Sequence, residues 1–273
     1  MIDKAPGAPI VVGADGSQAA LNAVIWAVDE ALDRDAPLRI VHVLPVEKDP
    51  DAPDDAFQLE VQYAESSLRA ATAAVKDTEK PVKVETDILW GPVDTALINE
   101  SQSAAMMCVG SVGIGPVARE FVGSTAAVLA EKAHCPVAII RTPHEKPVSG
   151  VDWIVVAVND DPDNDAVIEY AFNEAQLRQA PILAIGVSDR DFGDTLYDEL
   201  DRRLGNWKQR YPDLHVHPVS TRAGLAGFLA ENKDESVQLV VVGRVDAYGV
   251  AQVVGPHSHP ILRHGECSVL VVR

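Results

Sequence analysis

The chain contains one stretch of sequence twice, and this internal repeat limits the possible folds more than any other feature. Residues 10–43 (IVVGADGSQAALNAVIWAVDEALDRDAPLRIVHV) align without a gap to residues 154–187 (IVVAVNDDPDNDAVIEYAFNEAQLRQAPILAIGV). The ends match as well, since HCPVAIIR finishes at Arg141 and ECSVLVVR at Arg273. Self-similarity of this kind indicates a copied structural unit. The sequence therefore predicts two domains, residues 1–143 and 151–273, joined by the polar, proline-containing linker TPHEKPVSG.

Each copy alternates strand patterns with helix patterns. In the first copy, apolar β-rich runs predict strands at residues 10–14, 38–44, 82–89, 105–109 and 137–141. Helical spacing of apolar residues predicts helices after Ser17, a candidate cap, and at residues 57–76, 93–104 and 124–133. Alternating strands and helices form right-handed crossovers. We therefore expect an α/β chain with two tandem open, mostly parallel five-stranded sheets flanked by helices, a Rossmann-like fold.

Composition excludes several classes of partner. The formal net charge is −18, from 41 acidic residues against 23 Lys and Arg, so phosphates on a nucleic acid or an anionic membrane would be repelled. No apolar run approaches the roughly 20 residues of a membrane span, and the N-terminal MIDKAPGAP lacks the apolar core of a signal peptide. Three cysteines in or beside apolar runs, Cys108, Cys135 and Cys267, suggest buried free thiols. We therefore predict a cytoplasmic protein.

A glycine-rich segment lies between a predicted strand and a predicted helix. It begins at Val109 and reads VGSVGIGPVAREFVGSTAAVLAEKA. In an open α/β sheet, ligands bind at the carboxyl ends of the strands. Glycines let the backbone approach a ligand, and a helix beginning at Ser124 or Thr125 offers unpaired N–H groups and a positive dipole end. Together these features favour a phosphate site. The segment matches neither a P-loop nor a dinucleotide fingerprint.

The spacing itself is distinctive. Gly110 is followed after two residues by Gly113, and after nine more by the pair Gly123-Ser124. This pattern, G-2x-G-9x-G-[S/T], resembles the ATP-binding signature of the universal stress protein family. Four further segments resemble strands and turns of that family. They are VVGADGS (residues 11–17), VHVLP (41–45), WGP (90–92) and HCPVAIIR. The resemblance covers both copies and matches the tandem form of the family.

The resemblance implies a role for individual residues. In the family, the acid after the first strand meets the adenosine end of ATP, and a hydrophobic residue of the second strand lies by the adenine. The glycine ending the fourth strand approaches the ribose, and the later glycines and the Gly-Ser pair hold the phosphates. Arg119 lies in the same loop and could pair with phosphate oxygens. The implied binding residues are Asp15, Val43, Gly110, Gly113, Arg119, Gly123, Ser124 and Thr125.

Four of these assignments have structural alternatives. Gly110 could be a turn at the end of a strand, and Gly123 could be an ordinary helix stop. Arg119 could be an exposed loop arginine, and Asp15 alone could form an Asx-turn before the helix that Ser17 caps. No nucleophile and base form a recognisable pair. His215, His217, His257, His259 and His264 are interpreted as surface or core residues rather than metal ligands. The sequence therefore predicts neither a catalytic centre nor a protein-bound metal site.

Alignment of the repeat predicts that the second copy has lost its nucleotide site. Asn159 replaces Asp15, and Gly243 corresponds to Gly110. Asp246 replaces the next motif glycine, and its carboxylate would repel phosphates. Pro256 replaces the serine that follows the last glycine, and proline has neither a hydroxyl group nor an amide hydrogen. One nucleotide per chain is expected.

The predicted function is therefore an ATP-binding regulator of stress response or growth arrest, with Mg²⁺ on the phosphates. Bound ATP would set its conformation or its association with a protein partner that the sequence does not identify. A slow ATPase or phosphotransferase is the alternative, and a scaffold without nucleotide is a third interpretation. We expect the two copies to form a pseudo-dimer, because residues 137–141 and residues 269–273 would each otherwise be an exposed edge. The family resemblance implies that these two strands pair with each other. A homodimer of whole chains is a further expectation.

Overall fold

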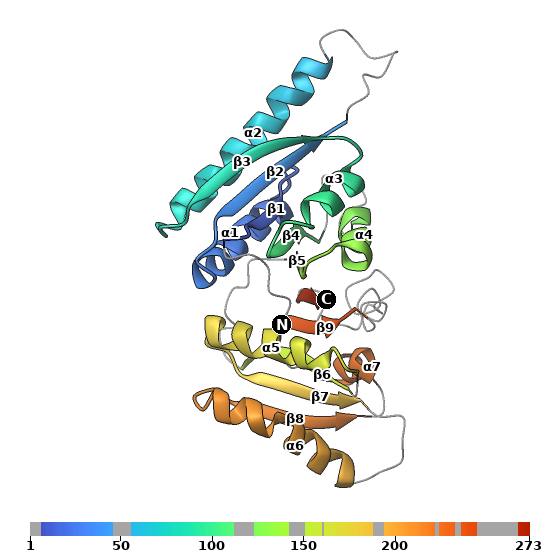
Figure 1. Cartoon of the computed structure of the whole chain (residues 1–273). Helices are drawn as coiled ribbons and strands as arrows, with labels where there is room; N and C mark the ends of the chain where they lie inside the picture. The colour runs from blue at the N-terminus through green and yellow to red at the C-terminus, as the bar shows by residue number, and fades with distance from the viewer. Residues whose placement is uncertain are drawn as a thin grey trace. The chain divides into compact units, whose positions relative to one another are not determined.

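The chain divides into two compact units, residues 1–143 and 144–273 (Figure 1). The computed structural model describes residues 7–45, 56–111, 123–141, 151–159, 161–187, 194–221, 224–232, 236–244 and 267–273. Within each unit the strands form an open, parallel sheet flanked by helices. The predicted α/β fold class is confirmed.

The described part of the first unit contains five strands, four of which have mainly apolar sequences that suit a sheet buried on both faces. Their order across the sheet is β3-β2-β1-β4-β5. Ile10 pairs in parallel register with Leu38 on one side and with Met106 on the other. The strands are β1 (Ile10–Gly13), β2 (Leu38–Leu44), β3 (Val84–Trp90), β4 (Met106–Gly110) and β5 (Val137–Ile140).

In the described part of this unit, four helices cover the sheet, two on each face (Figure 1). They are α1 (Gln18–Asp33) and α2 (Ala56–Asp77) on one face, and α3 (Val93–Glu100) and α4 (Ser124–Lys132) on the other. Ser17 caps α1 as predicted, because its side chain accepts a hydrogen bond from the amide of Ala20 at 3.1 Å. Helix α3 is shorter than the predicted 93–104, since the chain leaves the α-helical pattern at Ser101.

Alternate residues of the strands supply the core beneath α3 and α4. Val11, Val41 and Met107 are fully buried there. They pack in one cluster with Leu97 of α3 and Leu129 of α4. Because successive strand residues point to opposite faces, the intervening residues are directed toward α1 and α2. The alternation of side chains along short apolar strands therefore supplies apolar residues to both faces of the sheet.

The second unit repeats this plan. Its strand order is β10-β9-β6-β7-β8, and Ile154 pairs with Ile182 as Ile10 pairs with Leu38. Helix α5 corresponds to α1 and helix α6 to α2. The strands are β6 (Asp152–Val158), β7 (Ile182–Val187), β8 (Val216–Thr221), β9 (Ser236–Gly243) and β10 (Ser268–Val272). The helices are α5 (Asn164–Arg178), α6 (Asp194–Arg210) and α7 (Gly224–Glu231).

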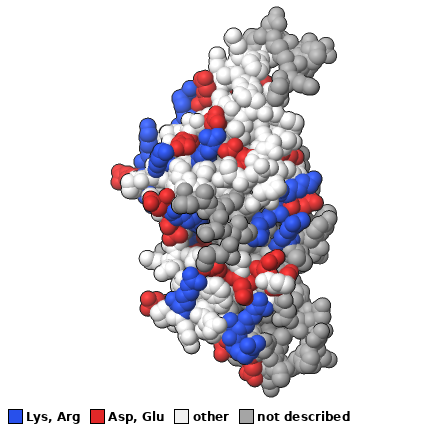
Figure 2. Space-filling model, viewed as in Figure 1, with Lys and Arg blue, Asp and Glu red and all other residues white. Residues whose placement is uncertain are grey.

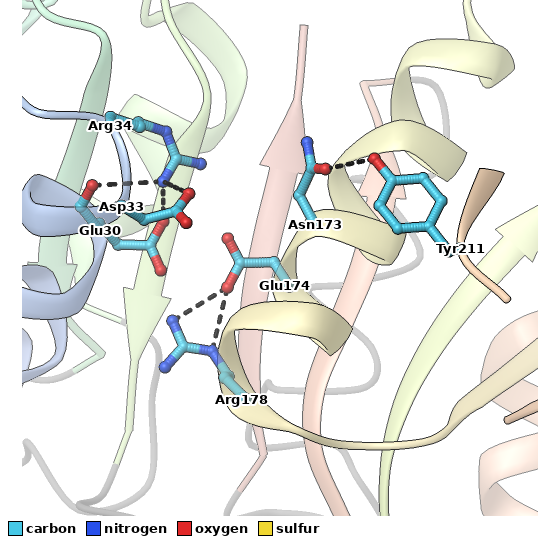
Figure 3. Close-up of polar contacts among 7 residues, drawn as sticks. All are labelled: Glu30, Asp33, Arg34, Asn173, Glu174, Arg178 and Tyr211. Atoms are coloured by element: carbon cyan, nitrogen blue, oxygen red, sulfur yellow. Dashed lines mark hydrogen bonds and ion pairs between the residues drawn. The ribbon is translucent and has the colours of Figure 1, made fainter. Parts of the chain in front are cut away.

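The repeat extends to buried polar groups, which Figure 3 draws for both units. Glu30 of α1 is fully buried and its Oε2 lies 2.5 Å from Nη1 of Arg34. At the equivalent place in α5, Glu174 is 1% exposed and accepts from Nε of Arg178 at 3.0 Å. A buried carboxylate needs such a partner. The same solution, a glutamate with an arginine one helical turn later, has been kept in both copies.

Charged side chains of both signs lie on the face of the molecule that Figure 2 draws. Arg39 of β2 shows the local arrangement, since its Nη2 lies 2.7 Å from Asp87 and its Nε 2.7 Å from Glu100. Burial disfavours the charged guanidinium, but hydrogen bonds and charges from Glu100 and Asp87 raise the pKa of Arg39 above its ordinary value. These contacts tie β2 to β3 and α3.

Each of the outer strands, β3 and β8, has one outward-facing position that offers no free amide. Leu38 N donates to Lys83 O at 2.8 Å, so the odd-numbered residues of β3 bond to β2 and the amide of Ile88 faces the open edge. That amide donates to the side chain of Asp87 at 2.9 Å. In β8, Ile182 N donates to His215 O, so Pro218 faces outward and has no amide hydrogen.

Candidate functional site

The carboxyl ends of β1 and β4 lie next to each other, because these two strands are parallel neighbours. The chain leaves β1 at Gly13 and β4 at Gly110. Asp15 follows the first strand end and is half-buried. The structure therefore brings Asp15 and Gly110, which the sequence placed in one site, to the same edge of the sheet.

Asp15 forms the Asx-turn that was its structural alternative. Its Oδ1 accepts a hydrogen bond from the amide of Ser17 at 2.9 Å. In the part of the chain that the structure describes, this is the one hydrogen bond that the carboxylate accepts. Oδ2 is left without a donor there, so the turn fixes the carboxyl group while sparing one oxygen for another partner.

Two side chains from other elements hold the main chain of this turn. His42 of β2 places Nδ1 2.7 Å from the carbonyl oxygen of Ala14. A carbonyl only accepts, so Nδ1 of His42 carries the hydrogen in this contact. The hydroxyl of Tyr63, on α2, donates to the carbonyl oxygen of Asp15 at 3.1 Å. The two rings meet edge to face, with centroids 6.0 Å apart.

The glycine of this turn accommodates the tyrosine. Gly16 has φ +86°, and a Cβ at that position would lie 2.6 Å from the Tyr63 hydroxyl and 2.8 Å from the Ser67 hydroxyl. Sequence reasoning identified Asp15 but missed Tyr63. No local pattern indicates this residue, because it lies on a helix 48 positions along the chain.

Gly110 has a structural reason to be glycine besides the approach to a ribose that the family resemblance implies. A Cβ there would lie 2.6 Å from the backbone carbon of Ala19 and 2.8 Å from the amide nitrogen of Ala20. The first turn of α1 therefore packs directly on the end of β4. This packing also holds the Asx-turn that precedes α1 close to β4.

Helix α4 begins at Ser124, as the sequence predicted. Gly123 precedes it as the capping residue and has no side chain, and no side chain of the described residues caps this end. The amide of Gly123 donates to the carbonyl of Ser111 at 2.7 Å. Ser124 is exposed and Thr125 is half-buried. The first turn of α4 thus presents uncapped N–H groups beside the end of β4.

Ser111 is a second feature of this edge that sequence reasoning did not single out. Its side chain is 1% exposed, and its hydroxyl has no hydrogen-bond partner among the described residues. Its amide is already paired, since it donates to Ile140 O at 2.8 Å. Buried hydroxyl groups are normally hydrogen-bonded, so Ser111 is a further polar group at this edge that can take a partner.

The remaining site residues of the first unit are only partly placed. Val43 lies on β2, where it pairs with Leu89 of β3 and packs half-buried against the core. Gly113 and Arg119 lie outside the described residues. Of the eight predicted binding residues, six are therefore placed, and all six belong to strand ends or to the start of α4.

The corresponding turn of the second unit repeats the Asx hydrogen bond but has different partners. Asn159 Oδ1 accepts from the amide of Asp161 at 3.0 Å, as Asp15 accepts from Ser17. Asn164, 2% exposed, accepts from the amide of Asn159 at 3.1 Å and donates to Ala157 O at 2.9 Å. Arg203 of α6 donates to the carbonyl of Asn159. Asp246 and Pro256 lie outside the described residues.

Other candidate sites receive little support from the described residues. Among them, no group of three or more His, Cys, Asp and Glu side chains is arranged to hold a metal ion. The three cysteines are buried and free, as predicted. His217 lies on β8, whereas His257, His259 and His264 fall outside the described residues.

No helix in the described part of the chain is long and apolar enough to cross a membrane.

Comparison with known proteins supplies the family. The model of the universal stress protein family matches this chain twice, at residues 8–141 and 151–273. The universal stress protein Rv2624c of Mycobacterium tuberculosis is 50% identical over 264 residues, which cover 97% of this chain and 96% of that protein. Rv3134c of the same organism, also a universal stress protein, is 38% identical over 282 residues, covering 100% and 98%.

A solved structure is similar along nearly the whole chain. The crystal structure of a universal stress protein from Archaeoglobus fulgidus aligns with a TM-score of 0.70 at 17% identity. The alignment covers 97% of this chain and 96% of that one. At this level of identity the likeness shows a shared fold.

Proposed function

This chain belongs to the universal stress protein family in its tandem form, and from that premise we propose that its first unit binds ATP. The observation that carries the proposal is the convergence of two features at one edge of the sheet. The Asx-turn of Asp15 ends β1, and the uncapped start of α4 lies beside the end of β4. The first suits a polar sugar and the second suits phosphates.

The chemistry of each group supports this arrangement. The free oxygen of Asp15 can accept from a ribose hydroxyl. The amides of Ser124 and Thr125, in the uncapped first turn of α4, can donate to phosphate oxygens. Gly113 and Arg119 complete the predicted set, and Mg²⁺ would neutralise part of the triphosphate charge. The half-buried Val43 supplies an apolar contact for adenine.

We infer that binding, rather than turnover, is the function. Phosphoryl transfer needs groups that position a nucleophile and neutralise developing charge. The proposed site offers backbone amides, one arginine and one carboxylate at the sugar end. A regulator of stress response or growth arrest, in which ATP sets the association with a protein partner, fits this inventory. Slow ATP hydrolysis is the second candidate, and a turnover assay on the purified protein separates the two.

The second unit, residues 151–273, is proposed to bind no ATP. In the strand-end turn at Asn159, side chains of the second unit already bond the main-chain polar groups. The amide and the carbonyl of Asn159 are bonded by Asn164 and Arg203, and the Asn159 side chain accepts from the next amide but one. The replacements at Asp246 and Pro256 oppose a phosphate site. Each chain would then hold one nucleotide in the domain of residues 1–143. Pairing of the two terminal strands, a homodimer and a cytoplasmic location remain predictions from the sequence.

The test uses a matched pair of substitutions. Asp15→Ala and Asn159→Ala each remove the side chain of an Asx-turn, so they should cost similar stability. Only Asp15→Ala should weaken ATP binding, by about ten-fold or more, because a hydrogen bond to a charged group is lost. Titration calorimetry should give a stoichiometry near one for the unmodified chain. Equal affinities of both variants would contradict the proposed site.

A second pair tests the phosphate end. Gly113→Val should abolish ATP binding without unfolding the chain, because a side chain would occupy the place proposed for the phosphates. Asp246→Val, at the aligned position of the second copy, should leave the affinity unchanged. Mass spectrometry of the small molecule retained after purification identifies the nucleotide directly. A stoichiometry near two, with both sites of similar affinity, would contradict the assignment of one site per chain.

A further inference from the structure

We propose that Tyr63 is a positioning residue of the nucleotide site, acting through the turn that carries Asp15. The inference rests on the proposed function. It adds a residue of α2 to a site otherwise built from strand ends and the start of α4. Tyr63 is not part of the glycine motif and lies 48 positions after the residue it contacts.

The hydroxyl end of the Tyr63 side chain lies against the turn that carries Asp15. Its hydroxyl donates to the main-chain carbonyl of Asp15 at 3.1 Å. The positive φ of Gly16 and its missing side chain leave room for the hydroxyl, since a Cβ there would lie 2.6 Å away. The edge-to-face contact with His42 places the tyrosine ring beside the imidazole that holds Ala14. Two successive carbonyls are thus pinned from β2 and from α2.

This arrangement has a consequence for the carboxylate. The Asx-turn ties Oδ1 of Asp15 to Ser17, so the direction of the other oxygen depends on the orientation of the turn. A main-chain carbonyl held from a packed helix restricts that orientation. Preorganised groups bind more tightly because less freedom is lost on binding. Tyr63 therefore raises affinity without needing to touch the ligand.

The exposure of Tyr63 argues against a role in packing alone. Its side chain is 47% exposed, whereas Ala64 and Leu68 on the same helix are 0% and 8% exposed. A tyrosine that served the core would be buried. Here the polar tip is the part of the residue that reaches the turn, and the hydroxyl is the group that phenylalanine would lack.

The experiment compares two tyrosine-to-phenylalanine variants of the full chain. Tyr63→Phe removes the hydrogen bond to Asp15. Tyr211→Phe removes a hydrogen bond of the second unit, in which the hydroxyl donates to Asn173 at 2.6 Å (Figure 3). Tyr63→Phe should weaken ATP binding about three- to ten-fold, the usual effect of one hydrogen bond. Tyr211→Phe should leave the ATP affinity unchanged.

A double-mutant cycle separates positioning from a purely structural effect. Asp15→Asn removes the charge and can keep the Asx-turn, as Asn159 does in the second unit. If Tyr63 acts by orienting the carboxylate, the loss from Tyr63→Phe should shrink to less than about two-fold in the Asp15→Asn chain. An unchanged loss in that background would overturn the inference.

Two further outcomes are decisive. A Tyr63→Phe chain that binds ATP as tightly as the unmodified chain overturns the role of Tyr63 while leaving the proposed function intact. An unmodified chain that binds no ATP at all overturns the proposed function, and the inference falls with it. The affinity of the unmodified chain, measured first, distinguishes these two failures.

Discussion

The two strand-end turns, at Asp15 and at Asn159, begin alike and are completed differently. Both side chains accept the amide two residues ahead, and both units keep the same register between their first two strands. The carbonyl of the first turn is held by a neutral tyrosine and that of the second by the arginine Arg203. The Asx hydrogen bond is therefore common to both units, whereas the side chain that holds the carbonyl of the turn differs.

The two turns differ most in whether their first backbone amide is already hydrogen-bonded. Asn164 fills the second turn and bonds the amide of Asn159. The aligned residue of the first unit is Ala20, which has no polar side chain. In the part of the chain that the structure describes, the amide of Asp15 has no acceptor. The first turn thus keeps free hydrogen-bonding groups, whereas the second satisfies its own.

The neighbouring strand explains why position 20 is alanine and position 164 is asparagine. The first turn of α1 rests on Gly110, whose Cβ would lie 2.8 Å from the nitrogen of Ala20. At Gly243, such a Cβ would meet one atom of the described residues within 4 Å, a methyl group of Val167 at 3.3 Å. The start of α5 therefore stands farther from its neighbouring strand. A close approach favours alanine at position 20, and a wider one leaves room for an asparagine.

The largest expected effect follows from this difference. Gly110→Ala should lower the free energy of unfolding by about 3 kcal/mol, because the new Cβ meets backbone atoms that cannot yield easily. Gly243→Ala should cost about 1 kcal/mol or less, since one methyl group can move by a few tenths of an ångström. Denaturant titrations of both full-length variants check the order. Equal losses would show that the two helix starts are packed alike.

An intermediate effect is expected at Asn164. Asn164→Ala should cost about 2 kcal/mol, because the buried carbonyl of Ala157 and the amide of Asn159 lose their partner together. Asn164→Asp tests the same contacts in another way. It keeps an acceptor for the amide but cannot donate to the carbonyl when ionised, so it should also destabilise. Thermal unfolding of both variants gives the measurement, and a loss below about 0.5 kcal/mol in Asn164→Ala would contradict the role given to this side chain.

The smallest expected effect should be equal in the two units. Asp35 and Gln179 occupy aligned positions just after α1 and α5 and have φ of 47° and 51°. Glycine adopts this conformation without strain, so Asp35→Gly and Gln179→Gly should each stabilise by up to about 1 kcal/mol. The two gains in the free energy of unfolding, measured from urea unfolding midpoints, should agree within the experimental error. A stabilisation confined to one unit would show that the repeated helix ends have diverged.

The sequence predicted the fold well because its signals were local. Apolar runs marked every strand of the first unit, and Ser17 was recognised as a cap from its position alone. Helix α3 ended early at Glu100, although apolar spacing continued to Ala104. There Ser101 donates to Ile98 O and its hydroxyl accepts from the amide of His134. That second contact is long-range, and no periodic pattern reports it.

The site was predictable only in part for the same reason. The glycines and Asp15 follow strand ends, where the position of a residue along the chain indicates its place in the sheet. Tyr63 and Arg203 reach their turns from helices 48 and 44 positions away. Such contacts depend on how a helix is rotated against the sheet. A single sequence cannot fix that rotation to the accuracy of one hydroxyl group.

The outer strands carry a consequence for how the protein behaves at high concentration. An open sheet edge is a template on which a second molecule could add a strand. In β3 the amide of Ile88 is already taken by Asp87, and in β8 Pro218 has no hydrogen to give. A strand arriving at either edge would find its ladder interrupted near the middle. Growth of polymers through these edges is thereby hindered.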